Sequence, residues 1–77
     1  MTIRAWNEPT VAPPTPGVYE RDYGNGYPML SFWDGKEWGF TEYMARRRPS
    51  KLMLNAVETY RFPPSAKQNL RWRMVAK

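Results

Sequence analysis

The chain is 77 residues long and carries a formal net charge of +5. This length allows one small domain with a thin hydrophobic core. The sequence contains no cysteine and no histidine, which excludes disulfides, thiolate zinc sites and any chemistry that needs a histidine base or ligand. Aromatic residues make up 16% of the chain, whereas disordered chains are poor in them. We therefore expect a small folded binding protein.

Residues 1–16 are set apart by their proline content. Four of the eight prolines lie here, at Pro9, Pro13, Pro14 and Pro16. Proline fixes φ and lacks an N–H donor, so this stretch is expected to be extended. We predict a flexible N-terminal arm over residues 1–16, which Trp6 is placed to anchor, and a single domain over residues 17–77. The alternative is that the arm is a proline-rich ligand for an aromatic groove.

After Gly17 the sequence takes on the alternating pattern that is typical of β-strands. Residues 18–23 alternate, with Tyr19 and Tyr23 on one face and Glu20 and Asp22 on the other. The next three residues, 24–26, are typical of a hairpin loop, because glycine and asparagine tolerate positive φ.

Two further strands are predicted to follow this hairpin loop. Residues 29–33 form the returning strand, Asp34-Gly35 a tight turn, and residues 38–43 a third strand. The pattern thus predicts a three-stranded antiparallel meander over residues 17–43.

A short helix is predicted over residues 51–60. Ser50 is a suitable N-cap, and Phe62-Pro63-Pro64 ends the helix. The apolar residues that share one helical face are Leu52, Met53, Ala56, Val57 and Tyr60.

The C-terminal residues allow two interpretations. Ser65 to Gln68 have capping-box spacing, which favours a helical turn. Leu70, Trp72 and Met74 alternate with arginines, which favours a strand with these three side chains inward. We prefer a fourth strand over residues 70–75.

These elements together predict an α+β fold. It consists of a small antiparallel sheet of three or four strands with one short helix packed on an aromatic face. The side chains that we expect mainly in the core are Phe32, Trp33, Trp38, Phe40 and Trp72.

Two stretches resemble small bacterial and phage-encoded proteins. One is the Pro16-Gly17-Val18-Tyr19 opening with the later run Phe32-Trp33-Asp34-Gly35-Lys36-Glu37-Trp38, and the other is Gln68-Asn69-Leu70-Arg71-Trp72-Arg73. The resemblance covers about thirty residues, and the Pro-Asp-Pro step that often follows the opening in the bacterial proteins is missing here. It implies a compact aromatic β unit of phage or prophage origin, and it brings no catalytic residues.

The carboxylates do not form a convincing catalytic or metal site. Glu20 and Asp22 lie on one strand face, roughly 7 Å apart by strand rise, within the range of a glycosidase pair. Any polar strand face gives this spacing, and so small a domain has little room for a water-excluding pocket. No loop has calcium-ligand spacing. We expect no enzymatic activity, no catalytic residues, no metal and no cofactor.

Charge is distributed unevenly along the chain. Residues 1–42 hold three basic and six acidic side chains, whereas residues 43–77 hold nine basic and one acidic. The second half is thus predicted to form a positive surface. The candidate partner-binding or nucleic-acid-binding residues are Arg46, Arg47, Arg48, Lys51, Arg61, Lys67, Arg71 and Arg73.

Two classes of function fit this pattern. The first is the one that the resemblance to phage proteins implies, an accessory protein that binds and modulates a host complex as a host-takeover or anti-defence inhibitor. The composition favours protein binding as well, because tryptophan, tyrosine, arginine and methionine are enriched at interfaces. The alternative is direct binding of DNA or RNA, with arginines on phosphates and aromatic residues such as Tyr43, Tyr60 or Trp72 on bases. A virion or structural component is a second alternative.

The location and the oligomeric state follow from similar arguments. No stretch approaches the roughly 18 apolar residues of a membrane span, and polar residues follow Trp6 at once, so no signal-peptide core is expected. We predict a protein of the cytoplasm, that of the host if it is phage-encoded. A homodimer is an alternative to a monomer, because thin cores often gain stability by self-association.

Overall fold

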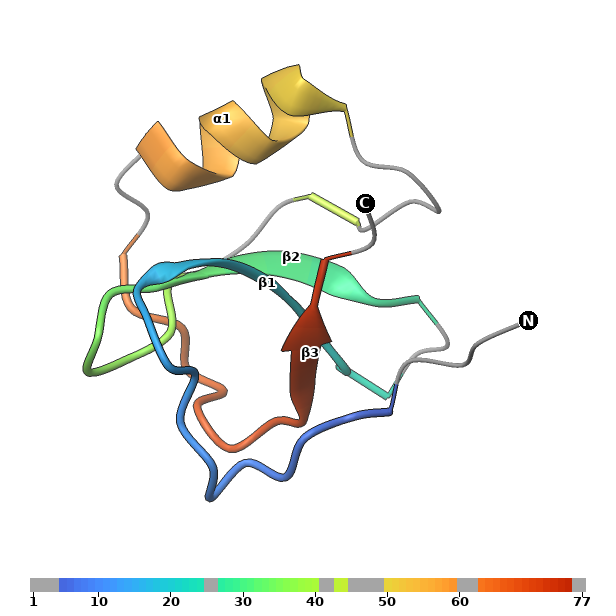
Figure 1. Cartoon of the computed structure of the whole chain (residues 1–77), viewed down its shortest axis with the longest axis vertical. Helices are drawn as coiled ribbons and strands as arrows, with labels where there is room; N and C mark the ends of the chain where they lie inside the picture. The colour runs from blue at the N-terminus through green and yellow to red at the C-terminus, as the bar shows by residue number, and fades with distance from the viewer. Residues whose placement is uncertain (1–4, 25–26, 41–42, 45–49, 60–62, 76–77) are drawn as a thin grey trace.

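The computed structural model describes residues 5–24, 27–40, 43–44, 50–59 and 63–75. Along the chain come strand β1 (Gly17–Arg21), strand β2 (Met29–Trp33), helix α1 (Lys51–Thr59) and strand β3 (Trp72–Met74), as Figure 1 shows. One antiparallel sheet and one short helix make up this arrangement. The predicted α+β fold is therefore confirmed. Among the residues that the structure describes, no helix has the length and apolarity to traverse a bilayer.

The sheet has the strand order β2-β1-β3, with β1 in the centre. On one side of β1, Glu20 lies opposite Leu30 of β2. On the other side, Arg21 lies opposite Trp72 of β3. The predicted C-terminal strand is therefore present, over a shorter range, and no helix forms in residues 63–75. Trp72 is buried as predicted, but Met74 is exposed, because the strand ends there.

The predicted third strand of the meander pairs with β2 only through isolated bridges in its described part and is not a regular strand. Trp38 bridges Trp33, and Met44 bridges Met29 at the far end. Between them Gly39 also bridges Pro64, and since proline has no N–H to donate, the Gly39–Pro64 pairing cannot extend as a regular ladder. Phe40 instead donates its backbone N–H to the carbonyl of Pro63, at 2.7 Å, and its side chain is exposed rather than in the core. Residues 41–42 lie outside the described part.

Helix α1 begins as the sequence predicts. The Oγ of Ser50 accepts a hydrogen bond from the backbone N–H of Met53 at 3.1 Å, which is N-cap geometry. The helix packs on β1 and β2 through the stripe that includes the buried Val57. Leu52, expected on that face, is 82% exposed. At 100° per residue it lies about 140° around the helix from Val57, so the narrow contact misses it.

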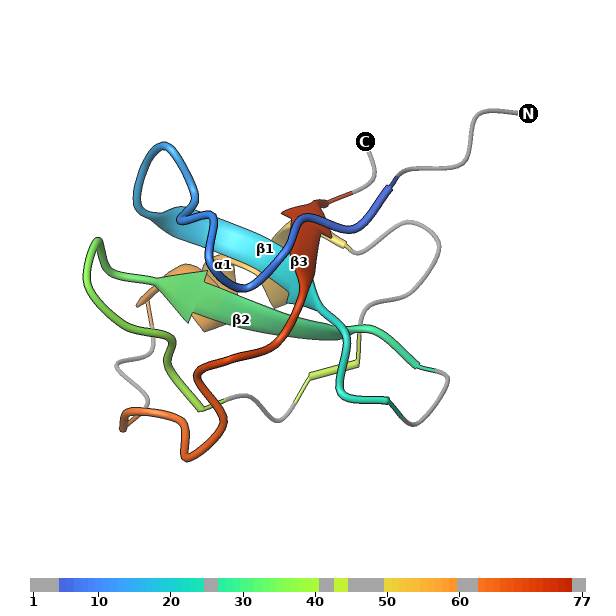
Figure 2. The ribbon, with the colours of Figure 1, turned by 90° about the horizontal axis from the view of Figure 1, so that it is seen from below.

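The aromatic cluster lies on the face of the sheet away from α1. Tyr19 contacts Trp38 and Trp72 edge to face, with ring centroids 5.9 Å and 5.2 Å apart. The expectation that the helix packs on this aromatic face is wrong, because the N-terminal residues and the chain around residues 63–71 cover it instead (Figure 2). Strand β1 buries large side chains on both faces, so the helix covers one face of the sheet and these other segments cover the opposite one. Of the other expected core residues, Phe32 and Trp33 are half-buried.

Residues 7–16, here called the N-terminal segment, run along this aromatic face. Asn7 pairs with Trp72 through two backbone hydrogen bonds of 2.7 Å and 3.2 Å. The indole N–H of Trp72 donates to the carbonyl of Val11 at 2.6 Å, and the Tyr19 hydroxyl donates to that of Thr15 at 2.7 Å. Pro13 is buried. The segment expected as an arm is thus bonded to the sheet; its flexibility in solution stays a prediction.

Candidate functional site

The predicted basic residues are only partly brought together. Lys51 opens helix α1 and is exposed, whereas Lys67 lies in the chain that covers the opposite face. The Lys67 ammonium is 5.9 Å from the ring centroid of Tyr23. Arg46, Arg47, Arg48 and Arg61 lie outside the described residues.

Arg71 and Arg73 are occupied by contacts within the sheet. Arg71 forms an ion pair with Asp22, and the Nε of Arg73 lies 2.8 Å from a carboxylate oxygen of Glu20. The Arg73 guanidinium also lies 4.0 Å from the ring centroid of Trp6. These carboxylates offset the charge of both arginines, so the two contribute less to a positive surface than the sequence count implies.

Arg21 is a buried cation that sequence reasoning missed. Its side chain is fully buried, with the guanidinium 4.7 Å from the ring centroid of Trp38. It donates a hydrogen bond of 2.6 Å to the carbonyl of Lys67, and no carboxylate in the described part pairs with it. Burial lowers the pKa of Arg21. Because side chains alternate along a strand, Arg21 lies on the same face as Tyr19. This alternation is the sequence signal that could have predicted an arginine among the aromatic rings.

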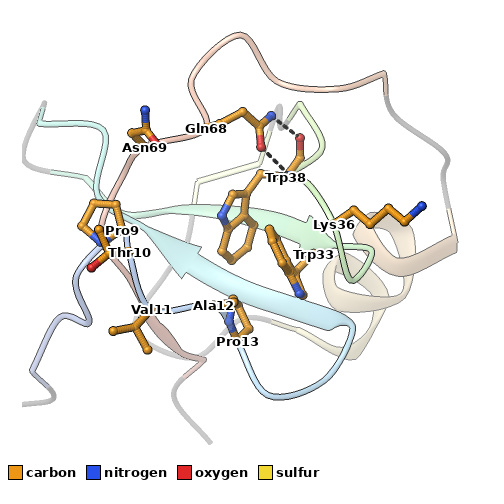
Figure 3. Close-up of a pocket in the computed structure, with 10 residues that line it drawn as sticks. All are labelled: Pro9, Thr10, Val11, Ala12, Pro13, Trp33, Lys36, Trp38, Gln68 and Asn69. Carbon is orange, nitrogen blue, oxygen red and sulfur yellow. Dashed lines mark hydrogen bonds between the residues drawn. The ribbon is translucent and has the colours of Figure 1, made fainter.

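A groove of about 180 Å³ opens between the N-terminal segment and two tryptophans, and we call it the tryptophan groove (Figure 3). One wall comes from the N-terminal segment and the other from the β2 end, the loop after it and the chain before β3. Its lining residues are Pro9, Thr10, Val11, Ala12, Pro13, Trp33, Lys36, Trp38, Gln68 and Asn69.

The two tryptophans are fixed by the tight turn between them. The Asp34 carboxylate accepts the backbone N–H groups of Lys36 and Glu37 at 2.7 Å and 2.8 Å. The turn brings the rings of Trp33 and Trp38 to a centroid distance of 5.1 Å with a tilt of 54°.

Gln68 holds the backbone of Trp38 from the other side. Its amide oxygen accepts the Trp38 N–H at 2.7 Å, and its amide nitrogen donates to the Trp38 carbonyl at 2.8 Å. The same nitrogen also donates to the carbonyl of Ser65 at 2.6 Å. The Gln68 amide is therefore engaged in positioning Trp38.

The indole N–H groups of Trp33 and Trp38 have no hydrogen-bond partner among the described residues. Trp38 is only 4% exposed, but its indole nitrogen is not among the buried polar atoms without a partner, so the exposed part of this side chain includes the N–H. In Figure 3 the Trp38 nitrogen lies on the ring edge toward Pro9 and Thr10. The tryptophan groove thus offers hydrogen-bond donors beside apolar surfaces.

Lys36 is the one charged residue that lines the tryptophan groove in the described part of the chain. No carboxylate lines it, so it offers no acid–base pair. Across the described ranges, no group of three or more aspartates and glutamates is placed to hold a metal ion. The groove can therefore bind a ligand through ring faces, N–H donors and one cation.

Sequence reasoning missed the tryptophan groove although each wall left a signal. The Trp-Asp-Gly-x-x-Trp pattern was assigned to the core, and the proline-rich stretch was assigned to an arm. Only the fold shows that the two lie against each other. Comparison of the chain with protein-family models, curated proteins and solved structures finds no significant match.

Proposed function

We propose that this chain is a small non-enzymatic accessory protein that binds a protein partner through the tryptophan groove. The observation that carries the proposal is the pair of unpartnered indole N–H donors at Trp33 and Trp38, in a groove walled by prolines. Tryptophan is enriched among residues that dominate binding energy, and such residues lie in well-packed pockets. A partner segment that enters the groove would satisfy the donors and cover the rings.

The resemblance to phage proteins supports a bacterial host complex as the partner. On this proposal the chain acts by occupying a surface that the complex needs, which amounts to modulation or inhibition. A basic chain is unsuited to mimic nucleic acid but suits an acidic protein surface.

Direct nucleic-acid binding is the second candidate, and the excess of basic residues over positions 43–77 favours it. It requires a continuous basic surface. Arg71 and Arg73 contribute less to one than expected because each pairs with a carboxylate. We therefore rank this candidate below protein binding.

Affinity capture from a nuclease-treated bacterial lysate tests the proposal. Wild type is compared with the double variant Trp33→Ala/Lys36→Glu and with Lys51→Glu, which reverses one charge on the helix, away from the groove. We expect the same proteins to be enriched by wild type and by Lys51→Glu, and lost with the double variant.

Equal enrichment by all three proteins would contradict a role for the tryptophan groove. A mobility-shift titration on DNA and RNA at about 50 and 200 mM salt tests the second candidate, because phosphate contacts weaken steeply with salt. Sub-micromolar binding that collapses at the higher salt would favour nucleic acid as the partner.

A further inference from the structure

The sheet already holds one proline-rich chain, its own N-terminal segment, which turns where Val11 donates its backbone N–H to the carbonyl of Glu8 at 3.0 Å and bends again over residues 14–16. Aromatic donors bond backbone carbonyls of that segment, from Trp72 to Val11 and from Tyr19 to Thr15. Pro13, between those two carbonyls, is buried. Proline-rich ligands are recognised in this way, because their extended backbone leaves carbonyls free and their rings pack on aromatic surfaces.

The tryptophan groove presents groups of the same kind, namely an aromatic ring and indole N–H donors (Figure 3). Trp33 supplies a half-buried ring, and Trp38 supplies a donor on a residue that is 96% buried. Neither indole N–H has a partner among the described residues. Only Arg21 Nε and Ser31 Oγ are buried side-chain polar atoms without a partner in the described part, so the Trp38 indole N–H is open to the groove, where a ligand acceptor can reach it.

The charge of the lining indicates the charge of the occupant. Lys36 lines the outer end of the groove, with its ammonium pointing away from the two tryptophans (Figure 3), and no lining residue in the described part carries a carboxylate. The volume of about 180 Å³ exceeds the roughly 30 Å³ share of one water molecule several times over. The groove thus has room for side-chain atoms and favours a ligand with a nearby negative charge.

We propose that the tryptophan groove binds an extended, proline-containing peptide segment of a partner protein that carries an aspartate or glutamate beside the proline. The proline ring packs against Trp33, a backbone carbonyl accepts the indole N–H of Trp38, and the carboxylate pairs with Lys36. This inference rests on the proposed function and narrows the partner to a class of sequence.

The test uses the full chain, labelled with ¹⁵N, and follows the four tryptophan indole N–H signals by NMR. The probe is an eight-residue peptide with two adjacent prolines and one glutamate, and its counterpart has glutamine in place of the glutamate. We expect the signals of Trp33 and Trp38 to move in a saturable way. The Trp72 signal should stay, because its N–H is already bonded to Val11. Single Trp→Phe variants assign the signals.

The charge contribution is tested with Lys36→Gln. Because the pair is exposed, the glutamate peptide should bind wild type about two- to fivefold more tightly than the glutamine peptide. That preference should vanish in Lys36→Gln and remain in the control Lys51→Gln. A preference that survives in Lys36→Gln would overturn the assignment of the carboxylate contact.

Other outcomes overturn the choice of occupant. The peptide class is wrong if the Trp33 and Trp38 indole signals do not shift at millimolar peptide, or if they shift with oligothymidylate alone. A shift that depends on protein concentration alone would indicate that a second copy of the chain occupies the groove. If the peptide fails while the Trp33→Ala/Lys36→Glu variant still loses its captured partner, the proposed function stands and the peptide class is wrong. If the peptide does not bind and the double variant also captures the same proteins as wild type, both the proposed function and the peptide class are wrong.

Discussion

Arg21 combines full burial with a positive charge and has no carboxylate partner in the described part of the chain. The Trp38 ring at 4.7 Å, the Tyr23 ring at 5.5 Å and the Lys67 carbonyl at 2.6 Å stabilise it. A cation over an aromatic ring gains more when desolvated, but removal of the charge from water is costly. Its long apolar stem also fills space beside Trp38, so volume and charge make separate contributions.

Substitution of Arg21 separates these contributions. We expect Arg21→Met, which keeps the stem, to change the free energy of unfolding by less than about 1.5 kcal/mol, because loss of the hydrogen bond is offset by relief of burial. Arg21→Ala should cost about 3 kcal/mol through the cavity that it leaves. Urea unfolding followed by tryptophan fluorescence measures both. Equal losses would instead mean that the charged contacts dominate.

Two turn aspartates make stability depend on acid pH. The backbone N–H groups of Glu37 and Lys36 lower the pKa of Asp34, and the N–H of Gly24 together with Arg71 lowers the pKa of Asp22. A carboxyl whose pKa is lower in the folded state adds stability above its ordinary pKa of 3.8. That stability is lost as the pH falls through the lowered value.

We therefore expect the urea midpoint to fall as the pH decreases from about 5 to 2. Asp34→Asn keeps an acceptor oxygen for the turn but does not titrate, so its midpoint should fall less over this range. Glu8→Gln, at an exposed position, serves as the control. Parallel curves for wild type and Asp34→Asn would contradict the assignment.

At the level of elements, helix α1 depends on its first turn. It has nine residues, and helices this short are marginal without packing. The described contacts bury Val57 alone among its side chains. The hydrogen bond from Met53 N–H to Ser50 Oγ is thus a sizeable part of what fixes the helix.

Loss of this cap is a direct test. Ser50→Ala should lower the free energy of unfolding by about 1 kcal/mol, whereas Ser50→Asp, which also accepts the Met53 N–H, should restore it. Chemical unfolding measures the first effect, and far-ultraviolet circular dichroism reports helix content. If Ser50→Asp is as unstable as Ser50→Ala, another property of the hydroxyl is responsible.

The elements differ in how far the sequence alone predicts them. Strands β1 and β2, the cap at Ser50 and the strand around Trp72 follow from local signals of alternation, turn and cap. The position of β3 beside β1 does not, because strand order depends on contacts distant in sequence. Exposure of Leu52 likewise depends on how narrowly α1 contacts the sheet.

The candidate site was harder to predict for the same reason. Tryptophans and prolines give the same sequence signal whether they fill a core or line a groove. Lys36 lies in the acidic half of the sequence and was not counted among the basic candidates. Arg71 and Arg73 were counted, but their carboxylate partners come from β1 and the residue after it, which cross-strand register alone reveals.

For the whole molecule, the N-terminal segment closes the aromatic face. Its Asn7 backbone pairs with Trp72 and its Val11 carbonyl accepts the Trp72 indole N–H, while Trp6, just before the segment, packs on Arg73. It also forms one wall of the tryptophan groove. Stability and binding are therefore both expected to depend on it.

Deletion of residues 1–11 should lower the free energy of unfolding by about 2–4 kcal/mol, since it removes four hydrogen bonds to Trp72 and uncovers its side chain. Deletion of residues 1–4 is the matched control, because it leaves every described contact in place. Thermal and urea unfolding measure both. Equal stability of the two truncated chains would mean that the segment behaves as the loose arm expected from its sequence.

The pairing of Asn7 with Trp72 also has a kinetic consequence. The two residues are separated by 65 positions, whereas the inner pair of the β1–β2 hairpin, Arg21 and Met29, is eight apart. Closure of the longer loop costs about 2 kcal/mol more in chain entropy. The hairpin should therefore form early in folding and β3 late, so the Trp72 indole would report the last step of refolding.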